Sequence, residues 1–350
     1  MKVYSYLDLN NEQGKITTHE LIINQDRFFL DFGSDSLTPN MVKDIKYIFI
    51  SHEHLDHFKS LFHLAEFLKE DIEIFMTNTT KKMIELSFQK MFNESISLRN
   101  YEKKAKVLER IRLLYFNQQH EIYHDNDNYL QLTVYPSGHT FGSSMLLIES
   151  NEVNLLYTGD MDYNKAVNDR SCYFDFDKDV DYIIIDGTNI LNNRKLDKVL
   201  SIAKDYAERN HIDLLIKPEK AVDIATILSK SKHLNEHKII YKKDLYPYLE
   251  VLLESGYELF TNDKIMLELT SNMPRFDKTV NLTTRPSQGY AKKFNYTLHI
   301  SLESMHHFCS SFIKSPKVLI GHYDRERFDE VMRIASDYGY HILVEGDNLL

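Results

Sequence analysis

The sequence predicts a layered α/β fold in which a smaller inserted module interrupts the main domain. Short apolar, β-rich segments that end in polar residues alternate with amphipathic helical segments through the first half. The same alternation returns near the C-terminus, after a stretch of different character. Strands interleaved with helices are typical of sheets covered by helices. With 350 residues, 43% of them hydrophobic, the chain can bury a sizeable core.

The first half of the chain is rich in predicted strands. They are the segments 27–33, 46–51, 72–77, 130–138, 144–150, 154–160 and 181–187. Apolar residues at helical spacing predict helices over 59–70 and 81–92. We predict that residues 1–186 form the first part of the main domain.

The character of the chain changes after Gly187. Predicted helices over 195–209, 221–230 and 245–255 bracket short strands at 213–217 and 237–241, and 271–293 is polar and loop-like. The earlier alternation resumes with strands at 296–301, 317–321 and 340–346 and with helices from Leu302 and Glu326. We therefore predict an inserted module over 187–295 and a completing part of the main domain over 296–350.

Composition limits the function classes. The formal net charge of -10 does not support nucleic-acid binding by the whole surface, because such surfaces are usually basic. Between residues 187 and 298, 18 Lys and Arg stand against 14 Asp and Glu, which fits either a groove for a polyanion or ordinary scatter of surface charge.

Location is predicted from cysteines and apolar runs. Cys172 and Cys309 lie far apart, which argues against a disulfide framework or a thiolate zinc site and fits a reducing cytoplasm. No apolar run is long enough for a bilayer, and the N-terminus lacks the apolar core of a signal peptide. We expect a soluble, cytoplasmic protein without a membrane partner.

The segment "SHEHLDH" (51–57) contains three histidines and an aspartate within six residues, directly after a predicted strand. Residues two apart on an extended segment share a face, so His52 and His54 can reach one metal. Asp56 and His57 can reach a second position after the chain turns. Imidazoles and a carboxylate suit zinc, iron or manganese, and this mixture does not choose among them.

Other predicted strand ends supply further candidate ligands. His139 follows a strand and lies beside a glycine, and Asp160 ends the strand 154–160, where it could bridge two metals. Asp31 ends the strand 27–33 and is better placed to orient a ligand than to bind metal. Each of these residues alone is more often a turn residue, but their shared position at strand ends favours one site.

These motifs, in this order, resemble the metallo-β-lactamase superfamily, and the rest of the chain resembles its β-CASP nuclease branch. That branch includes RNase J, the mRNA 3′-end endonuclease and Artemis-type nucleases. Its motif A matches Asp186 in "VDYIIIDGTN", its motif B matches His299 and Ser301 in "LHISLES", and its motif C matches His322 in "LIGHY". The resemblance implies an αββα sandwich with an inserted β-CASP-like α/β cap.

The resemblance also implies roles. His52, His54 and His139 would hold one of two divalent ions, zinc first, with manganese or iron as alternatives. Asp56, His57 and His322 would hold the other, and Asp160 would bridge the two. Asp56, Asp186 and His299 would be catalytic: the ions would activate a water, His299 would donate a proton to the leaving oxygen, and Asp186 would orient His299.

The sequence departs from the branch in its cap. The stretch "LLIKPEKAVDIATIL" keeps Pro218 but lacks the arginine that helps the family bind a nucleic-acid backbone. Asn189 stands where an aromatic residue is common. The segments 241–248 and 289–296 combine tyrosines with lysines, including Lys292 and Lys293, and could stack bases and contact phosphates or be ordinary surface.

Three functions follow from this sequence. The first is a metal-dependent nuclease for RNA or single-stranded DNA, with RNA favoured by a histidine at motif C. The second is a hydrolase of a small molecule such as a lactone, a thioester or a cyclic nucleotide, which the acidic body favours. The third is a non-catalytic binding protein. The complete set of candidate metal ligands argues against it.

Overall fold

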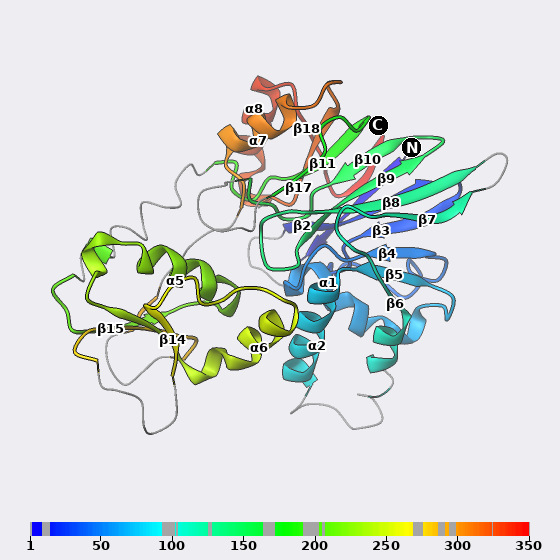
Figure 1. Ribbon diagram of the computed structural model, residues 1–350. Coiled ribbons are helices and arrows are strands. Elements are labelled where there is room, and N and C mark those ends of the chain that lie inside the picture. Colours follow the sequence, from blue (N-terminus) through cyan, green and yellow to red (C-terminus); the bar gives the residue numbers. More distant parts are fainter. Residues whose placement is uncertain are drawn as a thin grey trace. The chain divides into compact units, whose positions relative to one another are not determined.

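The structure is a computed structural model. It describes residues 2–8, 15–92, 102, 104–124, 128–163, 172–191, 203–204, 207–268, 276–285, 291–293, 299–323 and 325–349. The chain divides into two compact units (Figure 1). Unit 1 comprises 1–164, 171–193 and 299–350, and unit 2 comprises 165–170 and 194–298. The predicted helix over 195–209 lies mostly outside the described residues, and the predicted domain division stays a prediction.

Unit 1 is built on two sheets of seven strands each. Sheet A has the order β19 (Gly346–Leu349), β1 (Lys2–Asp8), β2 (Lys15–Ile23), β3 (Asp26–Leu30), β4 (Tyr47–Phe49), β5 (Glu73–Met76) and β6 (Ile111–Leu113). Sheet B has the order β18 (His341–Ile342), β17 (Lys317–Gly321), β11 (Tyr182–Asp186), β10 (Asn154–Tyr157), β9 (Ser144–Ser150), β8 (Tyr129–Pro136) and β7 (Gln119–His124).

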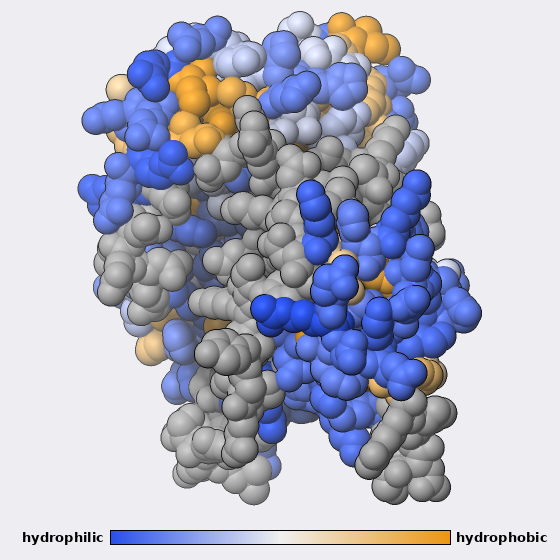
Figure 2. Space-filling model, turned by 90° about the vertical axis from the view of Figure 1, so that its left-hand side faces the viewer, coloured by the Kyte–Doolittle hydropathy of each residue, from blue (hydrophilic) through white to orange (hydrophobic). Residues whose placement is uncertain are grey.

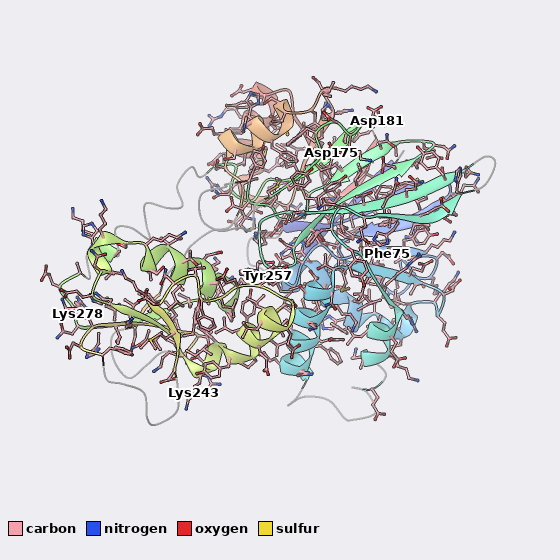
Figure 3. The ribbon with its side chains drawn as sticks, in the orientation of Figure 1. Phe75, Asp175, Asp181, Lys243, Tyr257 and Lys278 are labelled. Atoms are coloured by element: carbon pink, nitrogen blue, oxygen red, sulfur yellow. The ribbon has the colours of Figure 1, made fainter. Side chains whose placement is uncertain are left out.

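Three apolar clusters show how the layers pack. One cluster joins the facing sides of the two sheets and includes Phe28 and Phe75 of sheet A and Ile148 of sheet B (Phe75 is labelled in Figure 3). A second packs sheet A against α1 (Leu55–His63) and α2 (Asn78–Phe92). The third packs sheet B against α7 (Leu302–Ser310) and α8 (Phe328–Asp337). Unit 1 is therefore an αββα sandwich, as the sequence predicted.

The inter-sheet cluster should contribute strongly to the stability of unit 1. Ile148 is fully buried, so Ile148→Ala should lower the free energy of unfolding by about 2–5 kcal/mol through lost apolar burial and a residual cavity. Ile313, whose surface is 76% exposed, is a matched control, and Ile313→Ala should change stability little. Denaturant unfolding of the two variants checks this, and equal effects would contradict the assigned core.

Parallel pairing brings one end of several strands to the same edge of the sandwich. β3 and β4 are parallel neighbours in sheet A, and β10, β11 and β17 are parallel neighbours in sheet B. Residues that follow these strands therefore meet at one edge. The predicted site residues Asp31, His52, Asp160, Asp186 and His322 all follow or end these strands.

Unit 2 is an α/β layer around a parallel sheet, sheet C. Its order is β14 (Ile265–Leu267), β13 (Lys238–Tyr241), β15 (Thr279–Thr283), β12 (His211–Leu215) and β16 (Ala291–Lys293), with α5 (Ala221–Ser229) and α6 (Tyr246–Glu254). Lys278 precedes β15 and Lys243 follows β13, and Figure 3 labels these two at opposite ends of the sheet.

Short 3-10 helices link the larger elements. They span Ala65–Phe67, Lys106–Arg110, Pro218–Lys220, Lys232–Leu234, Lys243–Leu245 and Arg325–Arg327.

The structure corrects several predicted elements. The segment 271–293, predicted as a loop, contains β15 at the centre of sheet C, where Val280 and Leu282 are buried between β12 and β13. Polar threonines and an asparagine flank those two residues and hide the strand in the sequence. Strands β1, β2, β6, β7 and β14 were not predicted either. Helix α1 begins at Leu55, inside the histidine motif and earlier than predicted.

On the face that Figure 2 draws, the described residues are mostly polar. Apolar patches gather near the top of the molecule in this view, at the height of α7 and α8 in Figure 1. Among the described residues, no helix has the length and apolarity that a membrane crossing requires.

Candidate metal centre

The histidine motif forms the turn between β4 and α1. His54 is the residue before the helix, and its carbonyl accepts a hydrogen bond from the backbone N–H of His57 at 2.9 Å. Asp56 lies in the first helical turn, where the partial positive charge of the helix N-terminus favours a carboxylate. His52 and His57 are fully buried. The sequence thus folds its four candidate ligands into one compact turn.

The loop after β3 packs tightly on this turn. A Cβ on Gly33 would lie 1.9 Å from the carbonyl oxygen of Asp56, so only glycine fits there. Phe32 N–H donates to the carbonyl of His57 at 2.7 Å. Asp31 adopts a positive φ of 57°, which is uncommon outside glycine and concentrates at functional sites. This backbone holds the Asp31 carboxylate against the motif.

Asp31 accepts four hydrogen bonds. The donors are Ser51 N–H and Ser51 Oγ, both at 2.7 Å, Tyr157 Oη at 2.6 Å and His57 Nδ1 at 2.6 Å. Because His57 Nδ1 donates to Asp31, Nε2 is the nitrogen that faces the site, 3.5 Å from Asp160 Oδ1. Asp31 therefore orients a candidate ligand, as predicted from its strand-end position.

The first donor group comprises His52, His54, His139 and Asp160. His54 Nδ1 lies 2.9 Å from His52 Nε2 and 3.2 Å from His139 Nε2. Asp160 Oδ2 lies 3.6 Å from His52 Nε2 and 3.5 Å from His139 Nε2. Ligands at about 2.0–2.1 Å from a tetrahedral ion lie about 3.3 Å apart, so these four atoms fit one metal.

The second group comprises Asp56, His57 and His322. His322 Nε2 lies 3.8 Å from Asp56 Oδ2, and His322 Nδ1 forms a short ion pair with Asp160 Oδ1. Among the described residues, the buried Nε2 atoms of His57 and His322 have no hydrogen-bond partner. Buried polar atoms rarely lack a partner, and a metal ion is a partner that both nitrogens fit. His322, with φ 46°, is also in the left-handed region.

Asp160 lies between the two groups. Its Oδ2 faces His52 and His139, whereas its Oδ1 faces His57 and His322. One carboxylate with an oxygen toward each group is the arrangement that bridges two ions.

A third group comprises Asp160, Asp186 and His299. His299 Nδ1 donates to Asp186 Oδ2 at 2.8 Å and lies 3.6 Å from Asp160 Oδ2. Asp186 Oδ1 accepts from the backbone N–H of Thr188 at 2.9 Å, which fixes the carboxylate at the end of β11. Asp186 is therefore placed to orient the ring of His299.

Electrostatics match this division of roles. Burial acts to raise the pKa of Asp56, but the charges of His57, His322 and His54 outweigh it and lower the pKa to about 2. Asp160 behaves in the same way, with burial opposed by His322 and His57, and its pKa lies well below the usual range. These carboxylates are anions at neutral pH, as metal ligands must be.

The histidines differ in charge. Burial, with the charges of His57 and His54, holds the pKa of His52 well below its usual range, so its ring is neutral and can ligate. Burial also lowers the pKa of His57, but Asp160 and Asp31 outweigh it and raise the pKa to about 10. A metal at His57 would therefore displace a proton. The donor set and the orphaned nitrogens together fit divalent metal.

Two contributions were not visible in the sequence. Tyr157, three residues before Asp160, supports Asp31 from the opposite sheet. Glu53, between His52 and His54, accepts from Thr140 Oγ1 at 2.8 Å and so joins the motif to the loop that carries His139. Inward-facing and outward-facing residues alternate along β10, and this alternation indicates that Tyr157 faces inward. For Glu53, no local feature of the sequence indicates a contact with Thr140.

The remaining predicted site residues lie elsewhere. Ser301 caps α7, where its hydroxyl accepts from the backbone of Ser304. Lys292 and Lys293 lie on β16 of unit 2, and the structure describes only their backbone. Asn189 is buried in the turn after β11.

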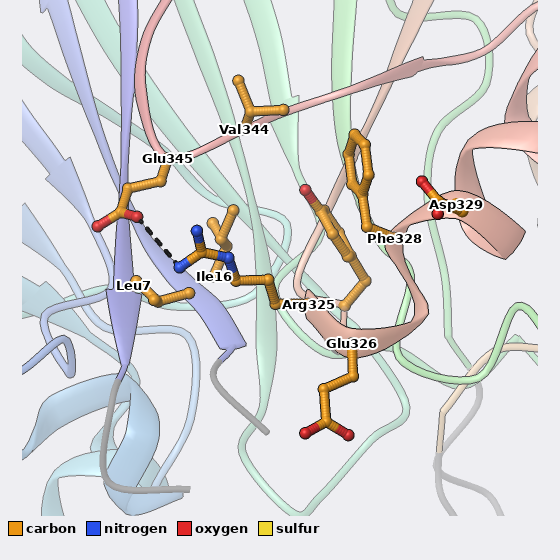
Figure 4. A pocket seen from close by; sticks show the side chains of 9 residues that line it. Leu7, Ile16, Arg325, Glu326, Phe328, Asp329, Val344 and Glu345 are labelled. Carbon is orange, nitrogen blue, oxygen red and sulfur yellow. Dashed lines mark ion pairs between the residues drawn. The ribbon is translucent and has the colours of Figure 1, made fainter. Parts of the chain in front are cut away.

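A separate cavity of about 460 Å³ lies in unit 1 (Figure 4). Arg325 reaches across it to Glu345 at 3.6 Å, and Leu7, Ile16 and Phe328 supply apolar walls. None of the described residues that line it belongs to the three donor groups.

Asp31 should be required for tight metal binding, because it orients His57. Asp31→Asn keeps the shape of the side chain but removes the charge and puts an NH₂ where an acceptor is needed. We expect metal affinity to fall by about 10–100-fold, as is usual for partners of ligating histidines. Calorimetric titration of the metal-free protein measures this. Tyr157→Phe removes one donor and should cost less; the opposite order, or an unchanged affinity, would contradict the assigned role of Asp31.

Comparison with known proteins identifies relatives. The model of the metallo-beta-lactamase superfamily domain matches residues 23–170. The chain is 28% identical over 262 residues to Probable RNase MJ4 of Methanocaldococcus jannaschii, covering 70% of this chain and 57% of that protein. It is 26% identical over 140 residues to Integrator complex subunit 11 of Danio rerio, covering 39% of this chain and 23% of that protein.

A fungal relative extends this set. Endoribonuclease ysh1 of Emericella nidulans is 29% identical over 122 residues, covering 32% of this chain and 13% of that protein. The chain thus spans little more than half of one relative and under a quarter of the other two. The matched domain, the sandwich and these relatives confirm the predicted resemblance. Residues 23–170 match a metallo-beta-lactamase superfamily domain, and through these relatives the chain resembles the β-CASP branch of that superfamily.

Proposed function

We propose that this chain is a metal-dependent phosphodiesterase that cleaves RNA. The observation that carries the proposal is the bridging position of Asp160 between two donor groups, with the His299–Asp186 pair beside it. The relatives named as ribonucleases or endoribonucleases support RNA as the substrate, in preference to DNA or a small molecule.

The family and the donor groups support divalent metal use. We assign one ion to His52, His54, His139 and Asp160 and the other to Asp56, His57, His322 and Asp160, with zinc first and manganese or iron as alternatives. When bound, such a pair lowers the pKa of a water and neutralises charge on phosphoryl oxygens.

The residues of the chain supply orientation and a proton. Asp186 accepts from His299 Nδ1, so the other ring nitrogen, Nε2, is the one that can hold a proton for the leaving oxygen. The pKa of Asp186 is lowered because His299 and neighbouring groups outweigh the effect of burial, which keeps the acceptor anionic. The side chain of His299 is 17% exposed, in contrast to the buried carboxylates of Asp160 and Asp186, and can therefore meet a substrate.

Unit 2 and the cellular location also belong to the proposed function. We assign unit 2 to the β-CASP-like cap, and the Lys and Arg excess over 187–298 supports a contact with the RNA backbone. We place the protein in the cytoplasm, which fits its two buried thiols, Cys172 and Cys309.

Cleavage of matched oligonucleotides tests the function. End-labelled RNA and DNA of one sequence, single-stranded and duplex, are incubated with metal-loaded protein and with chelator-treated protein. We expect metal-dependent cutting of RNA. Protein that holds two ions per chain and leaves every oligonucleotide intact, but hydrolyses a lactone or thioester, would contradict the proposal and favour the small-molecule hydrolase.

A further inference from the structure

The third donor group comprises Asp160, Asp186 and His299. Its role extends beyond proton donation by the His299–Asp186 pair. We propose that the group is a third cation site, weaker than the two assigned above, which fills when divalent metal is in excess and then withdraws His299 from proton donation. This inference rests on the proposed function, because it concerns the group that would protonate the leaving oxygen.

The spacing of the donor atoms fits one ion. His299 Nδ1 lies 2.8 Å from Asp186 Oδ2 and 3.6 Å from Asp160 Oδ2, and all three donors lie within 4.8 Å of one another. In the first donor group the corresponding separations run from 2.9 to 3.6 Å. The third group therefore needs no larger movement than the first to close on a metal at about 2.0–2.2 Å.

Two buried anions supply the attraction. Asp160 and Asp186 are 2% and 1% exposed, and the charge of Asp160 acts against ionisation of Asp186. Like charges held close together in a buried site favour a cation between them. His299 lies beside both carboxylates, so an ion would occupy the place that its Nδ1–H now occupies.

The shared carboxylate makes this site the weakest of the three. Asp160 Oδ2 also faces His52 and His139, so its charge is partly neutralised once the first group holds an ion. The neighbouring ions would also repel a third one. His299, with a side chain that is 17% exposed, is the open approach to this group, since both carboxylates are buried.

Occupation would change the state of His299 without any redox step. An ion on Nδ1 takes the lone pair of that nitrogen and displaces the Nδ1 proton to solvent, so the hydrogen bond to Asp186 is lost and the ring keeps only its Nε2 proton. A neutral, metal-bound imidazole is a poorer proton donor than an imidazolium, so cleavage should rise with metal to a maximum and fall at excess.

Ion counting tests the site independently of activity. Metal-free protein is dialysed against increasing Mn²⁺, and bound ions are counted per chain. We expect two tight ions and a third that binds at least about tenfold more weakly, because of the repulsion above. Asp186→Asn should bind two and lose the third. Asp179→Asn, which changes an exposed carboxylate paired with Lys314, should bind all three.

A second variant separates loss of the third site from misfolding of the Asp186→Asn protein. His299→Leu removes a different ligand of the same site and should also lose only the third ion. Wild-type protein that saturates at two ions would overturn the inference and leave the proposed function standing, and so would a third ion that persists in both variants. Protein that binds no ion would contradict the proposed function itself.

Discussion

Replacing Asp56 and His57 together by alanine should reduce RNA cleavage by at least about 10³-fold in kcat/KM, because the second ion loses two of its ligands. His57 is fully buried and its Nε2 faces Asp160, while Asp56 faces His322. The first donor group keeps His52, His54 and His139. The variant should therefore bind one tight ion fewer than the wild type, and metal analysis alongside the cleavage assay measures both effects.

The matched control uses the same residue types away from the site. Asp44 and His63 are both exposed, and His63 lies at the other end of α1 from Asp56. The Asp44→Ala/His63→Ala protein should cleave RNA and bind metal as the wild type does. Full activity in the Asp56/His57 variant, or loss in the control, would contradict the assignment of these residues to the second ion.

The local part of this site could be predicted from the sequence. His52, His54, Asp56 and His57 lie within one turn between a strand and a helix, so spacing alone indicates that they converge. Asp160 could be proposed because it ends an apolar strand, and Asp186 because it matches motif A of the β-CASP branch; the parallel pairing of β10 and β11 brings these two strand ends to one edge.

The supporting contacts could not be predicted, because they join segments that are distant in the chain. Tyr157 reaches Asp31 across 126 residues and between two sheets. Glu53 meets Thr140 only because two ligand-bearing loops happen to face each other at this edge. Such contacts depend on strand order and register, and the periodicity of the sequence does not specify either.

Strand β2 was not predicted, for a physical reason. β2 is buried along most of its length although it contains Thr17, Thr18, His19 and Glu20, so its sequence reads as polar. His19 is buried beneath the site, where a Cβ on Gly321 would lie 2.8 Å from its Nε2, and Ser5 pairs with its Nδ1. Burial, helped by His322 and His57, lowers the pKa of His19 to about 3, so it is neutral in the core. Tertiary packing therefore accommodates residues that a local pattern assigns to the surface.

His299→Ala should lower the rate of RNA cleavage by about 10²–10⁴-fold and leave the two tight ions bound, since general acid catalysis contributes on this scale. The proton donor matters most when the leaving oxygen is a poor leaving group, as a ribose hydroxyl is. In a 4-nitrophenyl phosphodiester the leaving group is 4-nitrophenolate, which departs without a proton. The same variant should therefore hydrolyse this ester with a much smaller loss of rate. Comparison of the two substrates separates proton donation from a structural effect.

The control for this prediction lies on the helix that follows. His307 is exposed on α7, and His307→Ala should leave both substrates unaffected. Equal losses on RNA and on the activated ester in His299→Ala would mean that the ring binds or positions the phosphate without donating a proton. The hydrogen bond at 2.8 Å between His299 and Asp186 favours proton donation, because an anionic acceptor on Nδ1 leaves Nε2 as the nitrogen that faces the substrate.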